Sequence, residues 1–222
     1  MTTLKSLTVN YMTIKKLVVG FLDTNCYIIS FGKKTILVDP GENVDRILKE
    51  LEGVYPAKGG VKLEKIILTH LHFDHIIAAK EIKEKTGAKI YCHKKDLKIV
   101  AERLLKKEDV DEFLEDGTQL TCLHAYKLTT ILTPGHTPGS ICLYDEKNKI
   151  LFSGDTIFAG SIGVTNYPGG NFKKIKSSIE KKLLTLPDDT RVYPGHGPDF
   201  ILGDEKEAIR KILGPKGAPS GQ

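Results

Sequence analysis

The sequence of 222 residues lacks several features that define whole classes of protein. It contains no apolar run long enough to cross a bilayer, so no membrane-spanning helix is expected. The N-terminal stretch MTTLKSLTVNYMTIKK lacks the apolar core and the cleavage site of a secretory signal, and we therefore expect a cytoplasmic protein with no membrane partner. No internal repeat and no internal linker are visible, so the length fits one domain.

Cysteine, glutamine and methionine are all scarce. No C-x-x-C pair is present, and the four cysteines lie in apolar, strand-like stretches, which indicates buried free thiols in a reducing compartment: Cys26, Cys92, Cys122 and Cys142. Glutamine occurs only at positions 119 and 222 while lysine and glutamate are abundant, a composition typical of heat-adapted proteins. One of the two methionines, Met12, directly precedes a strand-like run, so the true start is Met1 or Met12.

The charge is only mildly one-sided. The chain has 33 Lys and Arg against 28 Asp and Glu, a net charge of +5, and the basic residues are spread along its length. A nucleic acid partner is therefore not expected. The domain organisation that we expect is a disordered leader over 1–13, one domain over 14–213 and a disordered tail over 214–222.

Hydrophobic periodicity predicts strands that alternate with helices. Strands are expected at Ile14–Gly20, Cys26–Phe31, Lys34–Val38, Lys65–Leu68, Lys89–Cys92, Leu128–Leu132, Ile141–Tyr144, Ile150–Ser153 and Arg191–Tyr193. Helices are expected at Val44–Leu51, Ile76–Lys85, 94–116, Phe172–Leu186 and Glu205–Leu213. Several strands are joined as hairpins, which favours mixed sheets covered by helices over a purely parallel barrel.

The strongest motif is Thr69-His70-Leu71-His72-Phe73-Asp74-His75, which holds three of the seven histidines. It follows a buried strand and precedes a helix. Neighbouring imidazoles repel each other once protonated, whereas a metal ion accepts their neutral nitrogens. In an extended chain His70, His72 and Asp74 face one side and His75 faces another, so this one loop can supply ligands to two neighbouring metal ions.

Three further motifs repeat one design, in which an apolar strand is followed by a Gly or Pro turn and a side chain able to bind metal. They are Pro134-Gly135-His136-Thr137-Pro138-Gly139, Ser153-Gly154-Asp155-Thr156 and Pro194-Gly195-His196-Gly197. Five histidines and two aspartates exceed what one tetrahedral zinc ion needs. They suit two divalent metal ions, zinc by preference, with iron or manganese as alternatives.

The order of these four motifs resembles the metallo-beta-lactamase superfamily, and within it the glyoxalase II-like (hydroxyacylglutathione hydrolase-like) branch. The resemblance spans roughly 14–213. It implies an α/β (α+β) fold, a four-layer αβ/βα sandwich of two mixed β-sheets flanked by helices, with the metal site at one edge between the sheets. The segments Thr24-Asn25-Cys26-Tyr27 and Val38-Asp39-Pro40-Gly41 also match, with Asp39 supporting the ligands from behind.

The resemblance further implies a role for each ligand. One metal ion would be held by His70, His72 and His136, a second by Asp74, His75 and His196, and Asp155 would bridge the two. The expected reaction is attack of a bridging hydroxide on a thioester, such as a hydroxyacylglutathione, or on a related small acyl ester. Asp74 and Asp155 are the expected catalytic carboxylates. His93 and His124 lie outside the motifs and are interpreted as surface or structural residues.

The chain departs from the glyoxalase II pattern in two places. Only 26 residues (197–222) follow His196, too few for the helical glutathione-binding domain. Many short relatives carry G-R-T-D after the bridging aspartate, whereas Val164 and Asn166 occupy the two charged positions here, with Tyr167 next as an expected substrate contact. Glutathione recognition therefore does not follow from the resemblance.

Other functions remain as alternatives. A mononuclear iron persulfide (sulfur) dioxygenase is the first, and a lactonase or phosphodiesterase of the same superfamily is the second. A nuclease would need an additional domain or a basic arm. A β-lactamase is not expected, because that class generally has a thiolate where Asp155 stands. Seven intact ligands argue against a non-catalytic binding module.

Overall fold

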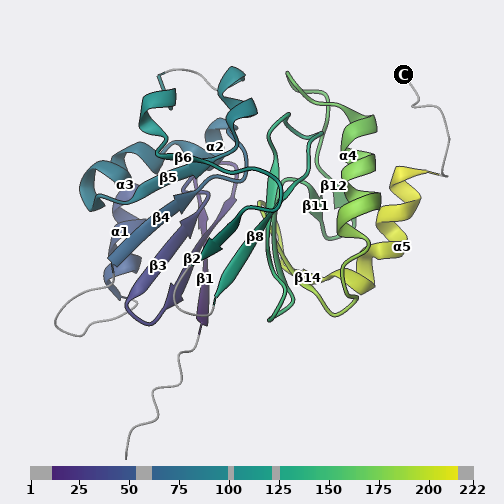
Figure 1. Cartoon of the computed structure of the whole chain (residues 1–222), viewed down its shortest axis with the longest axis horizontal. Coiled ribbons are helices and arrows are strands. Elements are labelled where there is room, and N and C mark those ends of the chain that lie inside the picture. The colour runs from purple at the N-terminus through teal and green to yellow at the C-terminus, as the bar shows by residue number, and fades with distance from the viewer. Residues whose placement is uncertain (1–11, 54–61, 100–102, 122–125, 215–222) are drawn as a thin grey trace, which may run out of the picture.

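A computed structural model describes residues 12–53, 62–99, 103–121 and 126–214. Its strands form two six-stranded sheets that lie face to face, with helices on both outer faces (Figure 1). The chain is therefore the expected sandwich of two mixed sheets flanked by helices. Most of the expected leader and tail, together with Cys122 and His124, lie outside the described residues.

Each half of the chain builds one sheet. In spatial order the first sheet consists of β1 (Met12–Val19), β2 (Thr24–Phe31), β3 (Lys34–Val38), β4 (Lys62–Ile67), β5 (Lys89–Cys92) and β6 (Glu112–Phe113). The second consists of β14 (Phe200–Ile201), β13 (Arg191–Pro194), β10 (Ile150–Gly154), β9 (Ile141–Asp145), β8 (Lys127–Leu132) and β7 (Gln119–Thr121). A hairpin is formed by β11 (Ile157–Phe158) and β12 (Ser161–Ile162).

Helices cover the outer faces of both sheets. The first sheet is covered by α1 (Val44–Gly53), α2 (Phe73–Ile76) and α3 (Ala79–Thr86), and the second by α4 (Phe172–Ser178) and α5 (Leu202–Leu213) (Figure 1). None of the helices in the described residues is long and apolar enough to cross a membrane.

Three buried apolar clusters separate the four layers. Strand β2 shows how the sequence achieves this, because every one of its residues is buried. Cys26 and Ile28 pack toward α1 and α3, whereas Tyr27 and Ile29 pack into the space between the sheets. Successive side chains of a strand point to opposite faces, so an unbroken apolar run is what a strand buried on both sides requires.

The parallel strands bring their carboxyl ends to one edge of the sandwich. In the first sheet β3, β4 and β5 run parallel, and in the second β10 and β13 run parallel. The segments that follow these strands carry Asp39, His70, Asp96, Asp155 and His196. Segments distant in the sequence are thus gathered where ligands of open α/β sheets usually bind.

The expected helix over 94–116 is wrong. The described part of this segment forms two 3₁₀ turns, η1 (Lys94–Lys98) and η2 (Lys107–Asp109), followed by β6. Backbone pairing with β5 outweighs the helical charge pattern, since Asp111 N donates to Ile90 O (2.9 Å) and Leu114 N to Cys92 O (2.8 Å).

Two other helices are shorter than expected. The segment Ile76–Lys85 is divided between α2 and α3, because Ala78 N donates to the carbonyls of Pro40 (3.1 Å) and Gly41 (3.0 Å) instead of continuing the helix. After α4 the chain makes a π-helical turn, η3 (Ile179–Leu183), in which Leu184 N donates to Ile179 O (2.9 Å). The final helix begins three residues earlier than expected, at Leu202.

Three cysteines behave as expected, since Cys26, Cys92 and Cys142 are free and buried. Burial raises the pKa of Cys92 to about 12 and that of Cys142 to about 11, so neither is a reactive thiolate. His93 is buried and structural, because its Nδ1 accepts from Lys95 N (3.2 Å) at the start of η1.

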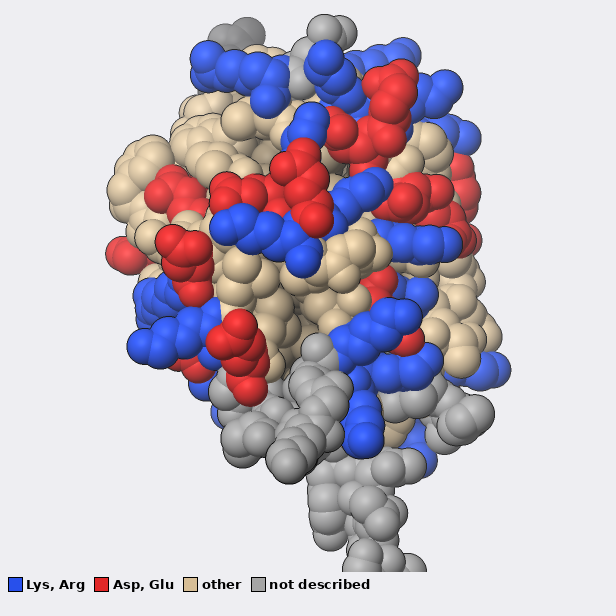
Figure 2. All heavy atoms as spheres, turned by 90° about the vertical axis from the view of Figure 1, so that its left-hand side faces the viewer, with Lys and Arg blue, Asp and Glu red and all other residues tan. Residues whose placement is uncertain are grey.

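The outer face over the first helices carries charges of both signs. Figure 2 shows basic side chains interleaved with acidic ones across this face. Several pair with each other, including Lys83 with Asp111 (2.6 Å) and Lys85 with Glu81 (3.0 Å). Such exposed pairs add little stability, and this face presents no uninterrupted basic surface.

Candidate metal centre

All seven of the proposed metal-binding side chains lie together at the edge between the two sheets. The loop after β4 supplies two of them and α2 supplies two more, and the segments that follow β8, β10 and β13 supply one each. Two groups that share no residue could each hold a metal ion, His70 with His72 and His136, and Asp74 with His75 and His196. A third possible group, Asp39 with His70 and His75, overlaps both of them. Within each group the ligand atoms lie within 4.8 Å of one another.

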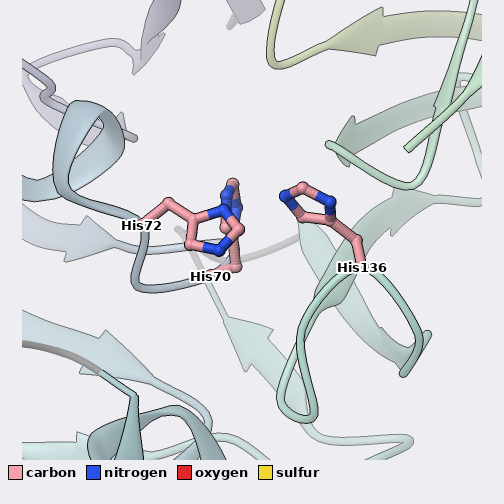
Figure 3. A group of neighbouring side chains, drawn as sticks. All are labelled: His70, His72 and His136. Atoms are coloured by element: carbon pink, nitrogen blue, oxygen red, sulfur yellow. The ribbon is translucent and has the colours of Figure 1, made fainter. Parts of the chain in front are cut away.

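The first group is made of histidines alone. His70 and His72 project from the loop after β4, and His136 faces them from the loop after β8 (Figure 3). The ring centroids are 4.8 Å apart for His70 and His72, 4.8 Å for His70 and His136, and 4.6 Å for His72 and His136. Three imidazoles directed at one point form a typical ligand set for zinc.

The second group combines a carboxylate with two histidines. Asp74 Oδ2 lies 3.4 Å from His75 Nε2 and 3.3 Å from His196 Nε2. The two Nε2 atoms are 3.2 Å apart. Thr24 Oγ1 donates to the same Asp74 oxygen (3.1 Å) and holds the carboxylate in place.

Asp155 lies between the two groups. Its Oδ2 is 3.6 Å from His136 Nε2, 4.0 Å from His70 Nε2 and 3.6 Å from His196 Nε2. Its Oδ1 is 3.5 Å from His75 Nε2. One carboxylate therefore faces the histidines of both groups.

Several ligand rings are oriented from behind by hydrogen bonds. His136 Nδ1 donates to the Val164 carbonyl (2.8 Å) and His196 Nδ1 to the Leu22 carbonyl (3.0 Å). A carbonyl oxygen can only accept, so each ring directs its Nε2 lone pair into the centre.

Asp39 supports the same loop from the end of β3. It accepts His75 Nδ1 (3.0 Å), Thr69 N (2.7 Å) and Thr69 Oγ1 (2.6 Å). Its backbone lies in the left-handed region at φ 51°, which costs energy for a residue other than glycine. Asp39 thus contacts a ligand from behind, as expected, and its backbone adopts an unfavourable conformation to do so.

The pKa values of the first group favour neutral imidazoles. Burial, reinforced by the neighbouring histidines, lowers the pKa of His72 to about 4 and that of His70 well below its usual range. Burial also lowers the pKa of His136. Neutral imidazole is the form that binds a metal ion.

The remaining groups are arranged around positive charge. Burial acts to raise the pKa of Asp155, but the charge of His75 outweighs it and the pKa is lowered. Burial acts to lower the pKa of His75, but Asp155 and Asp39 outweigh it and the pKa is raised. The cluster therefore stabilises a cation among its carboxylates, which is a charge that a metal ion would supply.

The buried atoms of the cluster also fit a metal ion. His70 Nε2, His136 Nε2 and Asp155 Oδ1 are buried without a hydrogen-bond partner. Buried polar atoms without partners are costly and rare. All three belong to side chains that face the centre, and their N and O chemistry is what zinc, iron and manganese accept. The donor set present therefore fits one metal ion in each group.

The sequence indicated no role for the individual side chains of the Thr24-Asn25-Cys26-Tyr27 segment. The structure shows one: Asn25 Nδ2 donates to the carbonyls of Pro194 (2.9 Å) and Gly197 (2.8 Å), and Tyr27 OH donates to Pro194 O (2.6 Å). The start of β2 thereby fixes the turn that carries His196. Tyr167 is 56% exposed, and its ring centroid lies 5.7 Å from that of His72.

Comparison with known proteins identifies the family. The model of the metallo-beta-lactamase superfamily matches residues 19–196, and the chain belongs to this superfamily. A protein of Bacillus subtilis described as a probable metallo-hydrolase, YqgX, is 33% identical over 210 residues, 88% of this chain and 95% of that protein. The hydroxyacylglutathione hydrolase GloC of Haemophilus influenzae is 31% identical, over 89% of this chain and 96% of that protein.

Solved structures agree with this assignment. BLEG-1, described as a B3 metallo-beta-lactamase, is 30% identical with a TM-score of 0.81, covering 91% of this chain and 100% of that one. TTHA1623 in a di-iron-bound form is 31% identical with a TM-score of 0.75, covering 88% of this chain and 98% of that one. Family, fold and a His/Asp cluster able to bind metal together support the role of a metallo-hydrolase.

Proposed function

We propose that the chain hydrolyses a small thioester or related acyl ester at a centre of two divalent metal ions. The first ion would be held by His70, His72 and His136, the second by Asp74, His75 and His196, with Asp155 shared between them. The observation that carries this proposal is the position of Asp155, whose two oxygens lie 3.5–4.0 Å from histidines of both groups. Such a pair of ions lowers the pKa of water toward neutrality and polarises the acyl carbonyl.

The chain's own groups prepare the reaction in definite ways. Asp74 keeps a lowered pKa, because its hydrogen bond with His196 and the charge of His75 together outweigh its burial. It is therefore ionised at neutral pH and is placed to orient a water molecule by accepting a hydrogen bond from it. The Thr24 hydroxyl holds the carboxylate in this position.

We propose that the substrate enters past Tyr167 and Phe73. Phe73 is 43% exposed beside His72, and its ring stacks on Phe21 of the β1–β2 turn, with centroids 6.0 Å apart. These aromatic rings suit the apolar part of a small acyl substrate. The relative named hydroxyacylglutathione hydrolase favours a thioester. The interleaved charges of the face in Figure 2 favour a small molecule over a nucleic acid.

Zinc is the proposed metal, because three imidazoles and a mixed His/Asp set are typical zinc ligands. The di-iron form of a relative makes iron the main alternative. Hydrolysis of a β-lactam, a cyclic amide, is a second candidate function, favoured by the likeness to a B3 metallo-beta-lactamase over that protein's whole length.

The test combines metal analysis with an activity panel. Purified wild-type chain is expected to hold two metal ions and to hydrolyse thioesters faster than lactones, phosphodiesters or β-lactams. Asp155→Asn is expected to lose one ion and at least a hundredfold in kcat/KM, because the shared carboxylate is neutralised. Asp145→Asn, a buried aspartate at the far end of β9, is the matched control and is expected to keep both. One iron ion per chain with oxygen uptake would replace this proposal with the dioxygenase, and full turnover by Asp155→Asn would refute the two-metal centre.

A further inference from the structure

A carboxylate outside the seven proposed ligands joins the two loops that carry the first group. Asp96 lies in η1, just after β5, and only 1% of its surface is exposed. It was not among the residues singled out by the sequence, because it belongs to a charged stretch and to none of the motifs. Its side chain instead points inward and accepts three hydrogen bonds.

The three donors come from both sides of the metal centre. Asp96 Oδ2 accepts Leu71 N (3.2 Å), the backbone amide between His70 and His72. The same oxygen accepts Thr137 Oγ1 (2.7 Å), directly after His136, and Oδ1 accepts Gly139 N (2.5 Å) in the same turn. The first loop belongs to one sheet and the second loop to the other. One side chain therefore bridges the gap across which the three histidines face each other.

The space around Asp96 leaves it little freedom. A Cβ on Gly139 would lie 2.7 Å from Asp96 Oδ1 and 2.9 Å from His93 Nδ1, so only glycine allows this approach. Burial raises the pKa of Asp96 to about 6, against the three hydrogen bonds that lower it, so at neutral pH the carboxylate is ionised and both oxygens accept. A second link, Ile141 N to Thr69 O (2.9 Å), joins the residue directly before His70 to the start of β9.

We infer that Asp96 is a positioning residue that fixes the distance between His136 and the His70–His72 pair and thereby sets the affinity of this group for its metal ion. The inference rests on the proposed two-metal centre. Second-sphere partners of ligands commonly change metal affinity by ten- to a hundredfold. Asp96 acts through backbone amides and a hydroxyl next to the ligands, so it holds the loops and leaves the reacting atoms untouched.

The test is metal binding to the full-length chain, measured by titrating Zn²⁺ into metal-free protein against a competing chelator. Asp96→Ala is expected to weaken binding of one ion by at least tenfold and to leave the other within threefold. Asp96→Asn retains the amide oxygen as an acceptor and is expected to lose less. Thr137→Val removes one of the three donors and is expected to weaken the same ion.

Asp145→Ala is the matched control. Asp145 is 2% exposed and its carboxylate accepts Asn148 N (3.1 Å) in the β9–β10 turn, at the other end of the sheet. Its loss is expected to lower thermal stability with both metal affinities unchanged. If Asp96→Ala fails to fold, Asp96→Asn and Thr137→Val carry the test.

The possible outcomes separate this inference from the proposed function. Wild-type affinity for both ions in every Asp96 and Thr137 variant would overturn the inference alone, and so would equal weakening of both ions. A wild-type chain that binds two ions but hydrolyses nothing would overturn the proposed reaction and leave the inference standing. A wild-type chain that binds no Zn²⁺ would overturn both.

Discussion

At the scale of single residues, the space around the proposed metal centre requires a glycine next to His196. Gly195 precedes His196, and a Cβ there would lie 2.1 Å from Asp155 Oδ1 and 2.8 Å from His75 Cε1. His75 is buried and bonded to Asp39, and only 11% of the Asp155 side chain is exposed, so neither can move aside cheaply. The glycine is thus required by close packing against the centre.

Gly195→Ala should accordingly reduce metal binding more than it reduces the stability of the fold. We expect metal content to fall by about one ion per chain and kcat/KM by a hundredfold or more, because Asp155 is displaced. Gly197→Ala is the control, since no atom lies within 4 Å of its Cβ, although its φ of 73° will cost about 1 kcal/mol. Metal analysis and kinetics of the two variants check this, and equal behaviour would contradict it.

The raised pKa of Asp96 has its own signature in stability. Its folded pKa of about 6 exceeds the ordinary value of 3.8, so the folded state binds the proton more tightly than the unfolded state. The contribution of Asp96 to stability is then fully present below about pH 4 and is lost as the pH rises through about 6.

Asp96→Asn removes this titration. In metal-free protein, the free energy of unfolding of the wild type relative to Asp96→Asn should fall by about 2.4 kcal/mol between pH 4 and pH 7, at about 1.4 kcal/mol per pKa unit. Urea unfolding at several pH values measures the difference. A difference that rises with pH, or stays flat, would show that the pKa is not raised.

At the scale of elements, the sequence predicted what is local. The loop from Thr69 to His75, the turn at His136 and the segments at Asp155 and His196 are short and carry their own Gly, Pro and His signals. Strand β2 likewise shows locally, in its apolar run Cys26–Ile29. The mixed-sheet architecture followed from these elements and is confirmed.

The elements that were predicted wrongly are determined by contacts with residues distant in the sequence. Nothing local in 94–116 reveals that Asp111 and Leu114 pair with β5, or that Asp96 turns inward to meet another sheet. The short strands β7, β11, β12 and β14 were also missed, because two or three residues are too few to show a period. The assignment of each ligand to one ion came from resemblance and stays a proposal.

The start of β2 gives a prediction at this scale. Asn25→Ala leaves the Pro194 carbonyl with Tyr27 OH and the Gly197 carbonyl with Lys16 Nζ as their remaining donors, and should cost about 1–3 kcal/mol of stability. It should also weaken metal binding, since the His196 turn is freed. Ser30→Ala, in the same strand but paired with Thr35 (3.3 Å), should lose stability without any change in metal affinity. Chemical unfolding and metal titration of both variants distinguish these effects.

At the scale of the whole molecule, the centre lies across the contact between the two sheets. Removing metal by chelation should lower the melting temperature by several degrees, because ligand binding stabilises only the folded state. Calorimetry with and without a chelator, followed by addition of Zn²⁺, checks both loss and recovery. An unchanged melting temperature would mean that no tightly held ion was present.

The four-layer arrangement determines which part of the molecule loses stability when the metal is removed. Each sheet is covered by its own helices over its own apolar cluster, and a third cluster fills the space between the sheets. The ligand segments join the two sheets along one rim. Bound ions would therefore cross-link the two sheets at this rim. Without bound ions, hydrogen exchange should become faster at the amides of Leu71, Thr137 and Gly195, while the middles of β2 and β9 stay protected. Metal loss would thus open the rim locally and leave both sheets folded.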